Sequence, residues 1–116
     1  MIHPNEVLGE LREPARELRD LIPDVIGAYA DMQRAAISDG VLPAKFKELI
    51  ALAVAVTREC DGCIASHARG AAKRGASESE VAEALGVAVM MNGGPGTVWA
   101  PRALAAFREI AGPPEA

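Results

Sequence analysis

Aromatic side chains are scarce in this chain of 116 residues, and their scarcity limits how it can fold. Phe, Trp and Tyr make up 3% of the sequence, although half of all residues are apolar, chiefly Ala, Val, Leu and Ile. A core of this composition is built from many short contacts and lacks the large buried areas that aromatic rings supply. We therefore expect further surface to be buried between subunits, which predicts a homo-oligomer.

Long apolar runs and basic clusters are also missing. Lys and Arg number 12 against 16 Asp and Glu, for a net charge of -4, and no basic block suggests a nucleic-acid partner. Residues 1–20 lack the apolar run of a signal peptide, and the apolar segment 49–56 is too short to cross a bilayer. We expect a cytoplasmic protein with no membrane contact, folded as a single domain over residues 1–116.

Only two cysteines occur, Cys60 and Cys63, and in a chain without a secretion signal they argue against a disulfide scaffold. In a reducing compartment, cysteines this close together are more often catalytic or metal-binding.

Apolar residues recur at helical spacing along the whole chain, and no segment alternates with the period of a strand. The fold class predicted is all-α, with about six helices. Starting signals for helices are found at Pro4, Pro23, Pro43, Asp61, the capping box of Ser77 and Glu80, and Pro101.

Other signals concern where helices stop and which faces they bury. Pro14 predicts a kink or an interruption, and Gly40 and Gly75 predict left-handed C-terminal ends. Residues 92–96, NGGPG, predict a turn. The segment after Pro43 is expected to be a central helix, buried on several sides. Met90 and Met91 are expected to continue the buried face of the helix that follows Ser77.

The sequence CDGCIASH places Cys60, Cys63 and His67 on one helical face, within roughly 60° of arc. A helix N-terminus stabilises a thiolate through its dipole and free N–H groups. An imidazole one turn further on can accept a proton from a thiol and return it to a leaving group. This spacing predicts a redox-active thiol pair assisted by a histidine.

Glu48 is the best candidate for a carboxylate that holds the imidazole. If residues 43–59 and 60–74 form a helical hairpin, Glu48 and His67 lie at comparable depths on facing helices. A carboxylate among apolar residues is expensive unless it is paired, which argues for a role at the site.

Glu48, eleven intervening residues, and then Cys60-x-x-Cys63-x-x-x-His67 resemble the core motif of the AhpD-like alkylhydroperoxidases. These proteins belong to the carboxymuconolactone decarboxylase superfamily. The resemblance runs from about Pro43 to the glycine-rich segment 92–96. It implies an all-helical bundle whose central helical hairpin carries the CxxC motif, assembled as a homotrimer or a homohexamer.

The resemblance also implies a mechanism without cofactor or metal. Cys63 would attack a hydroperoxide and become a sulfenic acid, and Cys60 would resolve it to a disulfide. A dithiol donor, a lipoyl group or a thioredoxin-like protein, would restore both thiols. Glu48 and His67 would form the proton relay. Residue 62 is Gly, where many members carry a His or Tyr that assists the relay.

Three alternatives remain open at this point. A structural or regulatory zinc site would use Cys60, Cys63 and His67, which fall short of a tetrahedral set of protein ligands. A redox-switched interaction subunit would use the same cysteines without catalysis. A decarboxylase-like lyase would act on a lactone acid, although superfamily decarboxylases generally lack this cysteine pair.

Overall fold

The computed structural model describes residues 1–113, and this part of the chain is all-α, as the sequence predicts. Its helices are α1 (Pro4–Leu21), α2 (Pro23–Ile37), α3 (Ala44–Thr57), α4 (Asp61–Lys73), α5 (Glu78–Asn92) and α6 (Gly94–Ala111), the six that were expected. None of the helices described is long and apolar enough to cross a membrane.

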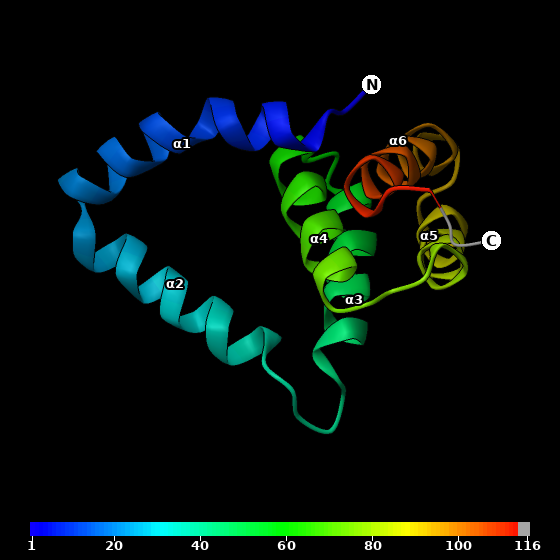
Figure 1. Ribbon diagram of the computed structural model, residues 1–116, viewed down its shortest axis with the longest axis horizontal. Coiled ribbons are helices and arrows are strands. Elements are labelled where there is room, and N and C mark those ends of the chain that lie inside the picture. Colours follow the sequence, from blue (N-terminus) through cyan, green and yellow to red (C-terminus); the bar gives the residue numbers. More distant parts are fainter. Residues whose placement is uncertain (114–116) are drawn as a thin grey trace.

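Helices α3 to α6 form the body of the molecule (Figure 1). Helices α3 and α4 make a helical hairpin, and the pair α5 and α6 packs against it. The core is built mostly from aliphatic side chains, and its members with no exposed surface are Leu52, Val56, Ile64, Ala65, Ala68, Ala71, Val81, Ala103 and Ala106. Five of these are alanines, whose small side chains allow close helix packing in place of aromatic bulk.

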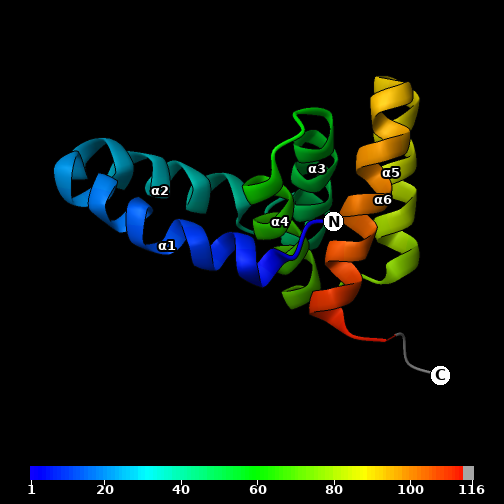
Figure 2. The same cartoon turned by 90° about the horizontal axis from the view of Figure 1, so that it is seen from above.

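Helices α1 and α2 project from this body as an arm (Figures 1 and 2). The radius of gyration is 14.5 Å, against about 13 Å for a compact domain of this length. Helix α2 buries no residue, although its apolar positions recur at helical spacing. The exposed apolar residues of the arm include Leu18, Leu21, Ile22, Val25, Tyr29 and Met32. The start of α1 packs against α4, but within residues 1–113 these apolar residues of the arm remain exposed.

The first three helices differ in detail from what the sequence predicts. Pro14 lies inside α1 and does not interrupt it. Gly40 does not have the left-handed conformation predicted, because α2 already ends at Ile37 with Ser38 in extended conformation. Pro43 is the N-cap of α3 and not its first residue, since its ψ of 148° is extended. Proline supplies the φ angle that suits either position.

The predicted burial of α3 is only half right. Leu49 and Leu52 are buried, whereas Phe46 and Ile50 are 43% and 54% exposed. The exposed side of α3 borders an apolar groove shared with α5. One face of the helix is therefore left for contacts that the isolated chain does not make.

The turn between α5 and α6 is tighter than predicted. Helix α5 continues to Asn92 and α6 begins at Gly94, so Gly93 alone joins the two helices. The φ of Gly93 is +67°, a conformation that suits glycine and reverses the chain within one residue. Pro101 consequently lies inside α6, not in its first turn. Beside the turn, Met90 and Met91 are 72% and 76% exposed and do not continue the buried face.

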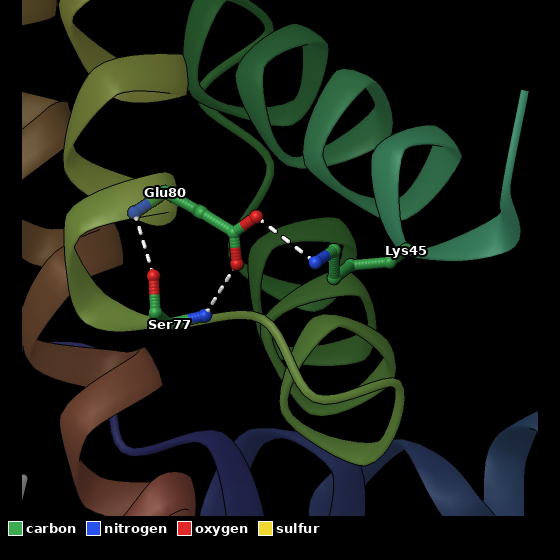
Figure 3. Close-up of polar contacts among 3 residues, drawn as sticks. All are labelled: Lys45, Ser77 and Glu80. Carbon is green, nitrogen blue, oxygen red and sulfur yellow. Dashed lines mark hydrogen bonds and ion pairs between the residues drawn. The ribbon is translucent and has the colours of Figure 1, made fainter.

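The predicted capping box at the start of α5 is present, and it also ties α5 to α3 (Figure 3). The Ser77 hydroxyl accepts a hydrogen bond from the Glu80 amide, and the Glu80 carboxylate accepts one from the Ser77 amide. Lys45 of α3 lies 2.9 Å from the other oxygen of that carboxylate. The Ser77 amide first, and then Lys45, hold the pKa of Glu80 below its ordinary value of 4.5.

Replacing Glu80 with Gln should therefore lower stability near neutral pH and have less effect in acid. A carboxyl group whose pKa is depressed in the folded state stabilises the fold above its unfolded pKa, and the benefit is lost as the pH falls through the folded pKa. Urea unfolding midpoints of wild type and Glu80→Gln should accordingly converge between neutral pH and about pH 3. Glu83→Gln, an exposed change on the same helix, is the control. A difference in unfolding midpoint between wild type and Glu80→Gln that stays constant across this pH range would contradict the lowered pKa of Glu80.

Candidate active site

The α3–α4 hairpin brings Glu48 and His67 into contact. They are 19 residues apart in the sequence, and Glu48 Oε2 lies 3.3 Å from His67 Nδ1. Glu48 extends from the middle of α3 and His67 from the middle of α4, so each side chain is held on a rigid element. The chain reversal just before Cys60 is what places the two positions opposite each other.

Glu48 is buried, with an exposed fraction of 6%, and it is the only charged residue in the buried set of the described chain. The residue that follows it, Leu49, belongs to the apolar core. Burial of an unpaired carboxylate is costly, and the His67 ring supplies the polar contact that offsets this cost.

The contact with Glu48 also sets the orientation of the His67 ring. A carboxylate accepts hydrogen bonds, so the tautomer that suits this geometry carries its proton on Nδ1 and donates it to Glu48. The other ring nitrogen, Nε2, is then free to accept a proton. The His67 side chain remains 21% exposed, which leaves it accessible from the surface. The pair can therefore take up and release a proton at the edge of the core.

Cys60 and Cys63 are joined by a disulfide at the start of α4, with their Cα atoms 5.2 Å apart. The predicted cap, Asp61, is instead the first helical residue, and Cys60 is the N-cap. The Cys63 amide donates a hydrogen bond of 3.2 Å to Cys60 Sγ. Helix α4 thus directs an N–H group at Cys60, as would stabilise a thiolate there. Cys63 is the more exposed residue of the two.

Helix α1 lies over the cysteine motif, which the sequence did not indicate. A Cβ atom at Gly62 would lie 3.1 Å from Leu11 Cδ1, so a larger residue at this position would press on the arm. Asn5 accepts a hydrogen bond of 2.9 Å from Arg69 of α4. No local signal links residues 5 and 11 to the motif, because these contacts depend on how α1 docks.

An apolar pocket of about 320 Å³ adjoins His67. It lies where the end of α2 faces α3, and it is lined by Gln33, Ala36, Ile37, Lys47, Ile50, Ala51 and His67. Gln33, Ala36 and Ile37 in this list come from the end of α2. Their position puts an apolar surface next to the imidazole.

Cys60, Cys63 and His67, the side chains of the alternative zinc site, do not form a metal-binding cluster in the structure. In residues 1–113 no group of three or more His, Cys, Asp and Glu side chains is suitably placed to hold a metal ion. The other histidine, His3, contacts Glu109 of α6, with Nδ1 and Oε2 3.1 Å apart.

The fold and site define an all-α protein with a CxxC pair at a helix N-terminus and a glutamate–histidine pair beside it. The model of the carboxymuconolactone decarboxylase family matches residues 23–107, and the chain belongs to this family. The match includes the whole Glu48, Cys60, Cys63 and His67 constellation.

Relatives occur in several bacteria. An uncharacterised protein of Cupriavidus necator is 39% identical over 100 residues, 86% of this chain and 88% of the relative. The uncharacterised protein 4 in the cox locus of Paracoccus denitrificans is 38% identical over 73% of this chain and 77% of its own length. The apo crystal structure of a carboxymuconolactone decarboxylase family protein from Legionella pneumophila superposes with a TM-score of 0.90 at 36% identity, covering 93% of this chain and 96% of that one.

Proposed function

We propose that this protein is a thiol-dependent peroxidase that reduces hydroperoxides through Cys60 and Cys63. The observation that supports it is the exposed Cys63 on the same helix as His67, whose imidazole is held by the buried Glu48. An exposed cysteine, a resolving thiol three residues away and a positioned base are the equipment that thiol redox cycling requires.

In the proposed reaction the Cys63 thiolate attacks the distal oxygen of the hydroperoxide and breaks the O–O bond. The alcohol leaves with a proton, and Cys63 becomes a sulfenic acid. The Cys60 thiolate then attacks this sulfur, forming the disulfide and releasing water. A dithiol donor, a lipoyl group or a thioredoxin-like protein, reduces the disulfide by two thiol–disulfide exchanges and is itself oxidised to a disulfide.

The two cysteines suit different steps of this cycle. The exposure of Cys63 favours its meeting with the peroxide. The hydrogen bond from the Cys63 amide favours a thiolate at Cys60, the form needed for resolution and also the better leaving group during reduction. His67 would take the proton of the Cys63 thiol and deliver one to the leaving alkoxide, with Glu48 holding the ring.

The pocket beside His67 supports a hydroperoxide with an apolar organic group as the substrate. Four of its seven lining residues are aliphatic, and the polar members are Gln33, Lys47 and His67. The proposed cycle also needs a supply of reduced thiols, and the cytoplasm, which keeps thiols reduced, is the location we propose.

The direct test is hydroperoxide consumption by the purified chain with a dithiol such as dihydrolipoamide. We expect catalytic turnover, with one donor dithiol oxidised for each hydroperoxide reduced. Absence of turnover above the uncatalysed rate with both organic hydroperoxides and hydrogen peroxide would overturn the proposal. A lactone decarboxylase is the second candidate because of the family's name, and loss of carbon dioxide from a lactone acid would reveal it.

We also propose that the chain assembles as a homotrimer or a homohexamer. An apolar groove of about 670 Å³ lies between α3 and α5 on the body. Its lining includes the exposed side chains of Leu42, Phe46, Ile50, Val54 and Val87. The arm presents a second exposed apolar surface, and contiguous exposed apolar surfaces mark sites of protein–protein contact.

Replacing Val87 with Glu should disrupt this assembly. Val87 is 56% exposed and lines the groove near Glu80 and Glu83, so a third carboxylate there would be buried beside like charges in any packed interface. Light scattering should show wild type as a trimer or hexamer and the variant as smaller species. Lys73→Glu, a charge change at an exposed residue outside the groove, is the control. A monomeric wild type would contradict the proposal.

A further inference from the structure

Gly70 lies inside α4, one turn beyond His67, and it faces the carboxylate of Glu48. A Cβ atom at Gly70 would lie 1.7 Å from Glu48 Oε2 and 2.4 Å from Glu48 Cδ. Both distances are far shorter than any van der Waals contact. A side chain at position 70 and the Glu48 carboxylate therefore cannot occupy their places at the same time.

Most other glycines within the helices show no such restriction. A Cβ atom at Gly9, Gly27 or Gly86 would meet no atom within 4 Å. Glycine inside a helix is unfavourable because it loses more backbone freedom on folding than alanine does. At Gly70 the absence of a side chain leaves the space that the Glu48 carboxylate fills.

We propose that Gly70 is a positioning residue for the Glu48–His67 pair, an inference that rests on the proposed peroxidase function and adds a determinant to it. The bare α4 backbone at Gly70 lets the carboxylate lie against the helix, 3.3 Å from His67 Nδ1. Any Cβ atom at this position would displace it. The atoms in the way belong to the end of a flexible side chain, so displacement means rotation of the carboxylate away from His67.

Loss of the Glu48–His67 contact would affect Cys63 through the His67 imidazole. Without the carboxylate, the ring has no acceptor holding its Nδ1 proton, so Nε2 is no longer kept as the free base. The Cys63 thiol then loses the group that removes its proton. The expected consequence is a less reactive Cys63 in a protein that is still folded.

The experiment measures alkylation of Cys63 by iodoacetamide in the reduced protein, with mass spectrometry to identify the modified residue, across the pH range of thiol ionisation. We expect Gly70→Ala to slow alkylation near neutral pH about tenfold and to move the pH midpoint upward by about one unit. Gly86→Ala introduces the same methyl group in another helix without obstruction, and its curve should superpose on that of wild type.

A second comparison places Gly70→Ala in a Glu48→Ala background, where the shortened side chain leaves room for the new methyl group. There Gly70→Ala should cause no further loss of Cys63 reactivity, and it should be less destabilising in thermal unfolding than in wild type. Equal destabilisation in both backgrounds would overturn the proposal, even if the single variant folds poorly.

The outcomes for the relay and for Gly70 are distinguishable. If Glu48→Ala moves the pH midpoint and Gly70→Ala does not, the positioning role is overturned and the proposed peroxidase mechanism stands. If neither variant moves it, the relay itself is overturned. Peroxide turnover by wild type, measured separately, decides the proposed function.

Discussion

Replacement of Cys63 by Ser is expected to abolish hydroperoxide turnover driven by a dithiol. A serine hydroxyl does not ionise near neutral pH and cannot form the sulfenic acid or the disulfide on which the cycle depends. Because Cys63 is an exposed residue near the start of α4, the substitution should leave the fold intact. Circular dichroism and thermal unfolding of the reduced proteins would verify this.

The matched control is Cys60→Ser, which removes the resolving thiol and keeps the nucleophile. This variant should reduce about one equivalent of hydroperoxide per chain and then stop, with Cys63 left as a sulfenic acid that dimedone labels. The two serine variants should therefore differ in a single-turnover experiment although both fail in steady state. If Cys60→Ser shows no first turnover and Cys63→Ser does, the roles of the two sulfurs are the reverse of those proposed.

Replacement of Glu48 by Gln is expected to lower kcat/KM for the hydroperoxide by about 100-fold or more, the effect typical of losing general acid–base assistance. Glutamine keeps the size of the side chain but removes the charge that holds the His67 ring. Its amide also offers a donor where the imidazole needs an acceptor. The neutral replacement should fold, because it removes a buried charge without leaving another charge unpaired.

Two controls separate a relay from a general electrostatic effect. Glu83→Gln removes an exposed carboxylate at the edge of the α3–α5 groove and should leave kcat/KM unchanged. His67→Ala should lower kcat/KM about as much as Glu48→Gln does. The kcat/KM of the double variant should be little below that of the less active single variant, because the effects of residues that act as a unit are not additive. An unchanged pH–rate profile in Glu48→Gln would show that His67 works without the carboxylate.

Much of the site was predictable because its spacing is local. Cys60, Cys63 and His67 share one helical face wherever this segment is helical. The motif also places Cys60 where a cap belongs, although the sequence pointed to Asp61, because aspartate is the commoner capping residue. Cys60 caps the helix because its sulfur accepts a hydrogen bond from the Cys63 amide, a weak interaction that propensity scales do not emphasise.

The less accurate predictions concern places where tertiary contacts override local signals. Pro101 remains inside α6, although it lacks an N–H to donate, because its neighbours Ala100 and Ala103 are buried and hold that helix against the core. Met90 continues an apolar stripe in the sequence but is 72% exposed, with no other helix of residues 1–113 covering it. Periodicity tells which face is apolar and not whether anything packs against it.

The sequence by itself determined the helical elements, the capping box of α5 and the face shared by the cysteines and His67, because each depends on residues within one or two turns. Only the tertiary structure decided that Glu48 reaches His67, that Gly70 leaves space for its carboxylate and that α1 docks on α4 at one end while the junction of α1 and α2 projects from the body. Those features depend on how helices distant in sequence pack, and the free energy of packing comes from surfaces that no local pattern specifies.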